Sequence, residues 1–506
     1  MSKLSCIVTV ELGTNAVRVF GFDLDGAPIG SMKGSYPTFH SQPDQSEQDP
    51  EQIFITMLYV LKNFLTEKIH PRKYKVVSLC FSASMHSLLT IDKKGVPLGR
   101  AITWADNRGK KEAQELNRST LAKKLYQATG TPIHPMSPLV KIRWMKNNDQ
   151  AGFSQTSKFL SIKTYIVHQL TGAYVIDYSL GSATGMMNIH SQKWDSEALA
   201  YAGITKDRLP ELTPVFASPG PLKKEYQHLL GLTPSTKILI GSSDGCMATI
   251  GSGVWSDDKA VVTIEDSGAV RVIGNKPLKD DKRRIFNYIV TDNCYISGGP
   301  TNNGGLVFEW FAHQFGDFKG PFDLDWSLDN LINEAAKVEP GSDGLLFLPY
   351  LLGERAPIWN PNAKGVYFGI NIKHERRHFI RATMEGIMYE IFSIGKLLGE
   401  YRTINDLSVH GSFASLPFCT QLIADVYDKP VSSRMHSDSV AVGTFLLTAT
   451  EMGIYSNIKD AAQTVSLPDR FMPRKQQHQV YMKYFKIFEK LSTQLADAFE
   501  DISDLQ

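Results

Sequence analysis

The sequence has 506 residues, of which 42% are hydrophobic and 21% are charged, proportions that are typical of soluble globular proteins. Its formal net charge is +2 at pH 7, so the chain lacks the strong overall field that favours nucleic acids or anionic membranes as partners. A chain of this length exceeds one comfortable hydrophobic core, and we expect two or three domains.

The five cysteines are scattered and form no CxxC pair, which excludes a cysteine zinc site and a disulfide framework. The N-terminal stretch "MSKLSCIVTVELG" reaches Glu11 too early to supply the apolar core of a signal peptide. No run of about 18 apolar residues follows. We therefore expect a cytoplasmic protein with no membrane and no nucleic-acid partner.

A β-hairpin is predicted for residues 8–19, "VTVELGTNAVRV", because β-branched residues flank a turn of small residues. The turn holds Gly13, Thr14 and Asn15, and exposed amides beside a threonine hydroxyl are able to bind phosphate oxygens. Glu11 is able to hold a hydrated Mg²⁺ ion, directly or through water. An ordinary hairpin explains the same residues, and the turn alone favours that interpretation.

Strand-like and helix-like segments alternate along the rest of the chain, which predicts an α/β protein. Buried strands that run into small-residue turns are predicted over 74–83 and 236–245. Apolar residues at helical spacing predict helices, which we expect over 50–69, 163–172, 375–401, 418–427 and 480–499.

A single carboxylate, Asp244, follows the apolar strand "ILIG" in the stretch "GSSDG". A carboxylate at the carboxyl end of a strand suits ligand contact in an α/β sheet, and an ionised carboxylate suits a general base. An Asx turn or a helix N-cap explains the same position equally well.

Two further stretches are dense in hydrogen-bonding groups. "SASMHSLL" (82–89) carries Met85 and His86 at the end of a strand, although a lone histidine is more often structural than ligand-binding. "ITWADNR" (102–108) places Trp104 beside Asp106 and Asn107. An aromatic face beside such groups suits a polyhydroxylated or carboxylated small molecule.

Residues 262–272, "VTIEDSGAVRV", repeat the pattern of the first hairpin with one deletion at the turn. A chance match is the less favoured explanation of so short a window, and a genuine repeat indicates two related domains that face each other across a small-molecule cleft. We place these domains at 1–250 and 251–506. In the second domain, "GGPTNNGG" (298–305) and "HGSFAS" (410–415) are loops compatible with a nucleotide, though weak signals alone.

Together these stretches resemble the FGGY carbohydrate kinases, and among them the gluconokinases. The most specific matches occur in order along nearly the whole chain: "MHSLL", "ITWADNR", "GTPIHPMSP", "SSDG", "TNNGG", "PYLLGERAPIW" and "RATMEG". The resemblance implies an α/β fold of two RNase H-like domains, of the actin/hexokinase ATPase type, flanking a cleft. It also implies in-line transfer of the γ-phosphate of ATP, with Mg²⁺, to a sugar or sugar-acid hydroxyl. Such kinases are often dimers, but no stretch here demonstrates a homodimer interface.

Carried over position by position, the resemblance makes Asp244 the catalytic base and Glu11 the metal-binding residue. The sugar-binding side and the base would belong to the first domain, and the nucleotide-binding side to the second. The substrate-binding residues would be Met85, His86, Trp104, Asp106 and Asn107. The nucleotide-binding residues would be Gly13, Thr14, Asn15, Arg18, Glu265, Asp266, Ser267, Asn303, Gly304, Gly411, Ser412 and Ser415.

The chain departs from the family pattern at several of these positions. Glu265 and Asp266 replace the usual Gly-Thr pair, and Glu11 replaces an aspartate. Gly411-Ser412 replaces Gly-Gly, Ser415 stands where gluconokinases often have arginine, and Arg18 takes the place of a lysine.

The acidic pair bears most directly on activity. Two unit charges about 4 Å apart repel by about 4 kcal/mol at an effective dielectric near 20, so the pair would weaken ATP binding unless a cation bridges them. The sequence therefore predicts a gluconokinase with two alternatives. One is a catalytically weakened, sugar-acid-binding homologue, and the other is an active kinase for another sugar such as xylulose.

Overall fold

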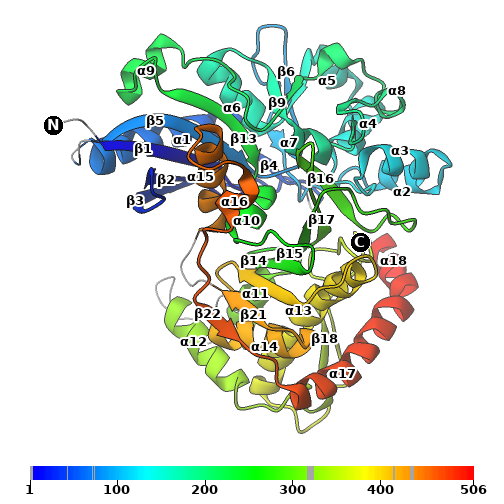
Figure 1. Cartoon of the computed structure of the whole chain (residues 1–506). Helices are drawn as coiled ribbons and strands as arrows, with labels where there is room; N and C mark the ends of the chain where they lie inside the picture. Colours follow the sequence, from blue (N-terminus) through cyan, green and yellow to red (C-terminus); the bar gives the residue numbers. More distant parts are fainter. Residues whose placement is uncertain are drawn as a thin grey trace. The chain divides into compact units, whose positions relative to one another are not determined.

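The computed structural model describes residues 4–42, 44–70, 72, 74–315, 324–413, 416–433 and 438–505 (Figure 1). The chain forms two compact units. Unit 1 comprises Met1–Gly251, Gly274–Ser297 and Asp438–Val465, and unit 2 comprises Ser252–Ile273, Gly298–Ser437 and Ser466–Gln506. Unit 1 therefore takes in two segments from the second half of the sequence.

Unit 1 is built on a mixed sheet in which three antiparallel strands adjoin two parallel ones. β1 (Leu4–Leu12), β2 (Ala16–Asp23) and β3 (Pro28–Ser35) form the antiparallel part. β5 (Tyr74–Ala83) and β13 (Lys237–Ser243) lie parallel to β1, which gives the strand order β13-β5-β1-β2-β3. The seven residues that end β1 are all buried, which explains why this strand lies inside the sheet.

Helices from distant parts of the chain cover this sheet. α1 (Pro50–Phe64) begins where the Asp49 side chain accepts hydrogen bonds from the backbone amides of Glu51 and Gln52, and it packs on β2 and β3. α15 (Ser439–Glu451), orange in Figure 1, packs on β1 and β5 and on α10 (Asp244–Gly251). Glycine makes this close helix contact possible, because a Cβ on Gly443 would overlap the backbone of Met247.

Further helices of unit 1 carry the residues discussed below. α4 (Pro138–Asn148) packs on α2 (Lys110–Arg118) and α8 (Ser196–Ala202). α6 (Ile162–Thr171) ends at Gly172, which adopts the left-handed conformation. The strand β9 (Val175–Asp177) leads directly into α7 (Tyr178–Ala183).

Unit 2 repeats the arrangement of a hairpin beside parallel strands. β14 (Lys259–Ile264) and β15 (Gly268–Gly274) are antiparallel, and β20 (Asp406–His410) and β21 (Val431–Ser433) continue parallel to β14. The long helix α13 (Arg376–Gly399) packs on α11 (Gly305–Phe315), α14 (Pro417–Tyr427) and α17 (Lys475–Gln494). Other strands of unit 2 are β18 (Leu346–Leu348), β19 (Val366–Phe368) and β22 (Asp469–Phe471), while β17 (Cys294–Thr301) is divided, with residues 294–297 in unit 1 and 298–301 in unit 2.

Most of the predicted elements are present, and the differences lie at their ends. Both predicted hairpins form, as β1-β2 and β14-β15. The helix predicted over 50–69 changes at Leu65 to a π-helical turn, Leu65–Ile69, and the helix predicted over 480–499 is interrupted at Leu495 before α18 (Ala496–Asp504). The strand predicted over 236–245 ends at Ser243, so that Asp244 begins a helix. Within the described ranges, no helix combines the length and the apolar character needed to cross a bilayer.

Candidate active site

The predicted site residues of unit 1 gather at the carboxyl edge of its sheet. Glu11, Ser82 and Ser242 are register partners on three adjacent strands, β1, β5 and β13. Since these strands are parallel, the turn after Glu11, the segment after Ser82 and Asp244 all lie at one edge. Residues far apart in the sequence are thus brought to the position where α/β sheets usually bind ligands.

A β-bulge sets the position of Asp244. The register between β13 and β5 shifts between Leu239 and Ser242, where Gly241 adopts a φ of 67°. A Cβ at Gly241 would overlap the carbonyl oxygen of Phe81, so the bulge requires glycine. Asp244 then begins α10, half-buried, and its Oδ1 accepts a hydrogen bond from the amide of Gly245 at 2.6 Å. The first turn of a helix favours an ionised carboxylate, as a general base requires.

The first hairpin turn is joined to the predicted substrate stretch. The hydroxyl of Thr14 accepts a hydrogen bond from the indole Nε1 of Trp104 at 3.0 Å. The backbone oxygens of the turn are held as well, by the hydroxyl of Tyr36 on Gly13 and by the side-chain amide of Gln48 on Thr14. Asn15, at the end of the turn, is exposed. Hydrogen bonds from Trp104, Tyr36 and Gln48 therefore hold the turn in place, while Asn15 is exposed and accessible to a ligand.

Glu11 is buried beside Arg18, which also contacts Asp438. Nη1 of Arg18 lies 3.8 Å from Oε2 of Glu11 and 3.2 Å from Oδ2 of Asp438, at the start of α15. Among the described residues there is no group of three or more carboxylate, histidine or cysteine side chains that would enclose a metal ion. Mg²⁺ in phosphoryl-transfer sites usually keeps several waters and takes one or two carboxylates plus substrate phosphates. The carboxylate of Glu11 at the sheet edge fits an ion held in that way.

His86 is held by the protein on both ring nitrogens. Its Nδ1 lies 2.8 Å from the carbonyl oxygen of Ala183, and its Nε2 lies 3.2 Å from the hydroxyl of Tyr288. A carbonyl only accepts, so Nδ1 carries a proton, and in the neutral ring Nε2 accepts from Tyr288. The backbone of His86 has a φ of 65°, which is uncommon for a non-glycine residue. His86 is buried, whereas the neighbouring Met85 is partly exposed.

The other predicted substrate residues differ in their burial and in how many of their polar atoms already bond to the protein. Asp106 is buried, and its carboxylate accepts hydrogen bonds from the amide of Ser46 at 2.8 Å and from the guanidinium of Arg108. Trp104 and Asn107 are partly exposed. The geometry therefore gives Asp106 a part in holding its loop, while Trp104 and Asn107 present surface to a ligand.

A buried lysine joins the two predicted substrate stretches. Lys141, on α4, donates hydrogen bonds from Nζ to the carbonyl oxygens of His86 at 2.6 Å and Thr103 at 2.7 Å. Burial lowers the pKa of Lys141 to about 7, with a smaller opposing effect from Asp106. Neither this lysine nor Tyr288 stands out in the sequence, where Lys141 is one of two charged residues among the apolar residues of "PLVKIRWM".

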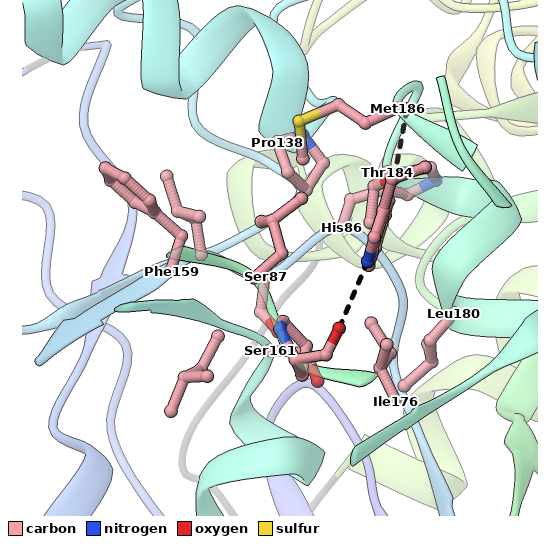
Figure 2. Close-up of a pocket in the computed structure, with 14 residues that line it drawn as sticks. His86, Ser87, Pro138, Phe159, Ser161, Ile176, Leu180, Thr184 and Met186 are labelled. Atoms are coloured by element: carbon pink, nitrogen blue, oxygen red, sulfur yellow. Dashed lines mark hydrogen bonds between the residues drawn. The ribbon is translucent and has the colours of Figure 1, made fainter. Parts of the chain in front are cut away.

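A small cavity lies against His86 within unit 1. Figure 2 shows Ser87, Pro138, Phe159 and Met186 around it, and its lining is largely apolar. The cavity measures about 20 Å³, which holds little more than one water molecule. It is too small for a sugar acid.

In unit 2, the structure brings the acidic turn together with two predicted nucleotide loops. The carboxylate of Glu265 accepts hydrogen bonds from the amide of Ser412 at 3.1 Å and from its hydroxyl at 2.7 Å. The carbonyl oxygens of Glu265 and Asp266 accept from the amides of Gly305 and Gly304. Two departures from the family pattern, at 265 and 412, thus contact each other.

Close backbone contact explains two of the predicted glycines. A Cβ on Gly304 would overlap the backbone of Ser267, and Gly411 has a φ of 101° beside the backbone of Ile264. The side chain of Asn303 is directed instead to the loop 353–354, where its amide donates to the carbonyl of Gly353 and to Oε2 of Glu354. Ser415 lies outside the described residues.

Glu354 is the residue of unit 2 that the sequence interpretation left without a role. Its buried carboxylate accepts from the hydroxyl of Thr301, the amide of Asn302, the side-chain amide of Asn303 and the amide of Arg355. It therefore holds the "TNN" loop. The motif "PYLLGERAPIW" marked the segment, but no spacing rule indicated which residue of it acts on which loop.

Comparisons with known proteins agree with this geometry. Residues 6–251 match the FGGY family of carbohydrate kinases, N-terminal domain, and residues 260–452 match the C-terminal domain of the same family. The chain belongs to the FGGY carbohydrate kinases. This FGGY kinase is 35% identical over 513 residues to the gluconokinase of Bacillus subtilis (strain 168), a match that covers 99% of this chain and 98% of the relative.

Two solved structures are similar to this FGGY kinase over nearly its whole length. They are a gluconate kinase and a ligand-bound xylulose kinase, both from Lactobacillus acidophilus. Each is 31% identical, has a TM-score of 0.91, and matches 99% of this chain and 100% of the solved chain. The predicted α/β fold of two related domains and the assignment as a carbohydrate kinase are confirmed. Sugar kinases of this family use ATP, typically with Mg²⁺.

Proposed function

We propose that this FGGY kinase transfers the γ-phosphate of ATP to D-gluconate, forming 6-phosphogluconate and ADP, with Asp244 as the general base. The observation that carries the proposal is the position of Asp244 at the carboxyl edge of the unit 1 sheet, beside Glu11 and the two predicted substrate stretches. The 35% identity to a gluconokinase over 99% of the chain supports gluconate as the acceptor.

In the proposed reaction, Asp244 accepts the proton of the acceptor hydroxyl. The hydroxyl oxygen forms a bond to the γ-phosphorus, and the bond from that phosphorus to the bridging oxygen of ADP breaks. The amides of Thr14 and Asn15 and the hydroxyl of Thr14 donate to phosphate oxygens, while the amide of Gly13 already donates to the carbonyl of Ala16. Glu11 would hold Mg²⁺ through water, and the ion, when bound, neutralises charge on the phosphates.

The acidic turn does not by itself argue against turnover. Glu265 and Asp266 are exposed, where water and salt screen their charge, and Glu265 already accepts two hydrogen bonds from Ser412. The repulsion of a phosphate about 4 Å away falls to roughly 1 kcal/mol when the surroundings approach bulk water. ATP binding is therefore weakened by the turn and not abolished.

A xylulose kinase is the second candidate. The observation that favours it is the solved xylulose kinase, which matches this chain with the same identity and TM-score as the gluconate kinase does. The pocket residues named above suit both a polyhydroxylated ketose and a sugar acid.

Release of ADP from MgATP, measured against D-gluconate, D-xylulose, L-ribulose, glycerol and no acceptor, tests these proposals. Asp244→Asn is measured beside the native protein, with Asp281→Asn as the matched control, because the Asp281 side chain is 94% exposed. We expect gluconate-dependent ADP release that is lost in Asp244→Asn and kept in Asp281→Asn. Turnover with xylulose alone would mean that the acceptor is a ketose and not gluconate. Turnover that survives in Asp244→Asn would refute the assignment of Asp244 as the general base.

The absence of turnover with every acceptor is also decisive. If gluconate nevertheless raises the melting temperature of the protein, the chain is a sugar-acid binder, and the kinase proposal for gluconate is wrong.

A further inference from the structure

We propose that Ser179, held by the buried pair of Lys163 and Asp177, is a positioning residue that fixes the strand end bearing Asp244. This inference rests on the proposed function, in which Asp244 is the general base. It concerns residues on α6, β9 and α7 to which neither the family resemblance nor the candidate site gave a role.

A fully buried ion pair lies next to the end of β13. Nζ of Lys163 is 2.7 Å from Oδ2 of Asp177, and the two side chains are 1% and 0% exposed. Removing two charges from water costs free energy that their attraction alone often fails to offset, so such a pair requires further hydrogen bonds. One of these runs from Nζ of Lys163 to the carbonyl oxygen of Ser242, at 3.0 Å.

Asp177, the acidic member of the pair, is hydrogen-bonded to Ser179. Oδ1 of Asp177 accepts from the backbone amides of Ser179 and Leu180 and from the hydroxyl of Ser179. Because an ionised carboxylate only accepts, the hydroxyl proton of Ser179 is committed to Asp177. The oxygen of Ser179 is then left as an acceptor, and it receives the hydroxyl of Ser242 and the amide of Ser243, both at 2.8 Å.

These contacts reach the two residues that directly precede Asp244. Beyond the bulge at Gly241, Lys163 holds the carbonyl of Ser242 and Ser179 holds the amide of Ser243. The bulge interrupts the β13–β5 ladder between Leu239 and Ser242, and pairing resumes at Ser242 and Ser82, so side chains from α6 and α7 add a second constraint at the end of the strand. The direction in which the Asp244 carboxylate points follows from this constraint.

The test is the substitution Ser179→Ala, which removes the acceptor for Ser243 and leaves the ion pair in place. The matched control is Ser78→Ala. Ser78 is also fully buried, and its hydroxyl donates to the carbonyl of Lys237 at the opposite end of β13. The measured quantities are kcat, the KM for gluconate, the KM for ATP and the melting temperature of each variant.

Displacement of a catalytic group by about 1 Å costs up to a hundredfold in rate, and we expect Ser179→Ala to lower kcat by about tenfold or more. Both KM values should stay within about twofold, because the substrate contacts are untouched. Ser78→Ala should lower the melting temperature without a comparable loss of kcat.

Equal losses of kcat in Ser179→Ala and Ser78→Ala would overturn the inference. If the alanine variant does not fold, Ser179→Cys is measured in its place, since a thiol is a weaker acceptor and should give a smaller loss of the same kind. A native protein without acceptor-dependent ADP release would refute the proposed function and this role with it. An active native protein with an unaffected Ser179→Ala variant would refute the positioning role alone.

Discussion

Replacing Lys141 by methionine tests a fully buried titratable group of unit 1. The ammonium is 0% exposed and donates to the carbonyl oxygens of His86 and Thr103. Methionine is of similar length but carries neither charge nor donor. The substitution therefore relieves the cost of a buried charge and leaves two buried carbonyls without their donor.

The size and sign of the effect follow from the pKa. Burial lowers the pKa of Lys141 from 10.5 to about 7. Between pH 7 and 10.5 the unfolded chain binds a proton at this lysine that the folded chain does not, so the stability of the native protein rises with pH. Below pH 7 the folded protein carries the full cost of the charge, about 5 kcal/mol. From pH 6 to pH 9 the native protein should gain roughly 2 to 3 kcal/mol relative to Lys141→Met.

Urea unfolding at pH 6, 7, 8 and 9 measures this difference, and comparison with the variant cancels the groups that both proteins share. Lys146→Met, on the same helix but only partly buried, is the control and should show no such trend. A difference between native protein and Lys141→Met that is constant with pH, or that falls as the pH rises, would refute the reasoning. We also expect a higher KM for gluconate in Lys141→Met, because the two substrate stretches lose their common anchor.

Three further predictions concern single contacts. Burial and the nearby Glu354 carboxylate raise the pKa of Glu390 well above its ordinary value, so Glu390→Gln should cost less than about 1 kcal/mol in thermal unfolding at pH 7. Glu354→Gln should cost more than about 2 kcal/mol, because its new NH₂ group would face donors that the carboxylate now accepts, and equal losses would contradict the protonation assigned to Glu390. Glu265→Gln removes a charge but keeps an acceptor for Ser412, so calorimetric titration should show that ATP binds roughly fivefold more tightly. An unchanged Kd for ATP would count against repulsion between Glu265 and the phosphates. Gly241→Ala should lower the melting temperature sharply, whereas Gly220→Ala, also at positive φ but with nothing within 4 Å of its Cβ, should have a small effect; similar shifts would mean that strain, not overlap, governs the bulge.

The sequence predicts the fold correctly where a secondary-structure element is determined by a local pattern of residues. The hairpins at 8–19 and 262–272 are short repeats of β-branched residues around a turn, and both form as antiparallel pairs. The helix end at Leu495 and the π-helical turn at Leu65–Ile69 have no distinct periodicity, since apolar residues continue at helical spacing through both. That the segment 438–465 packs within unit 1 depends on long-range contacts, which no local pattern reveals.

The polar loops of the site could be predicted from the sequence, but the residues that hold these loops in place could not. Asp244 could be singled out because a carboxylate follows an apolar strand. Lys141, Lys163 and Ser179 act on main-chain atoms, which every residue possesses, so their partners leave no trace in the sequence. The substitutions at 265 and 412 were visible one by one, but only the structure shows that they contact each other.

The contribution of α15 to unit 1 has a consequence for synthesis of the chain. This helix packs on β1, β5 and α10, yet it follows β13 by about two hundred residues. At a rate of about 5 to 20 residues per second, a ribosome needs roughly 10 to 40 s to add them. During that interval the emerging first half exposes the surface that Ser439–Glu451 covers in the folded protein, including the face of α10 that meets Gly443. The nascent chain therefore leaves this surface exposed until Ser439–Glu451 has been synthesised and has packed onto it.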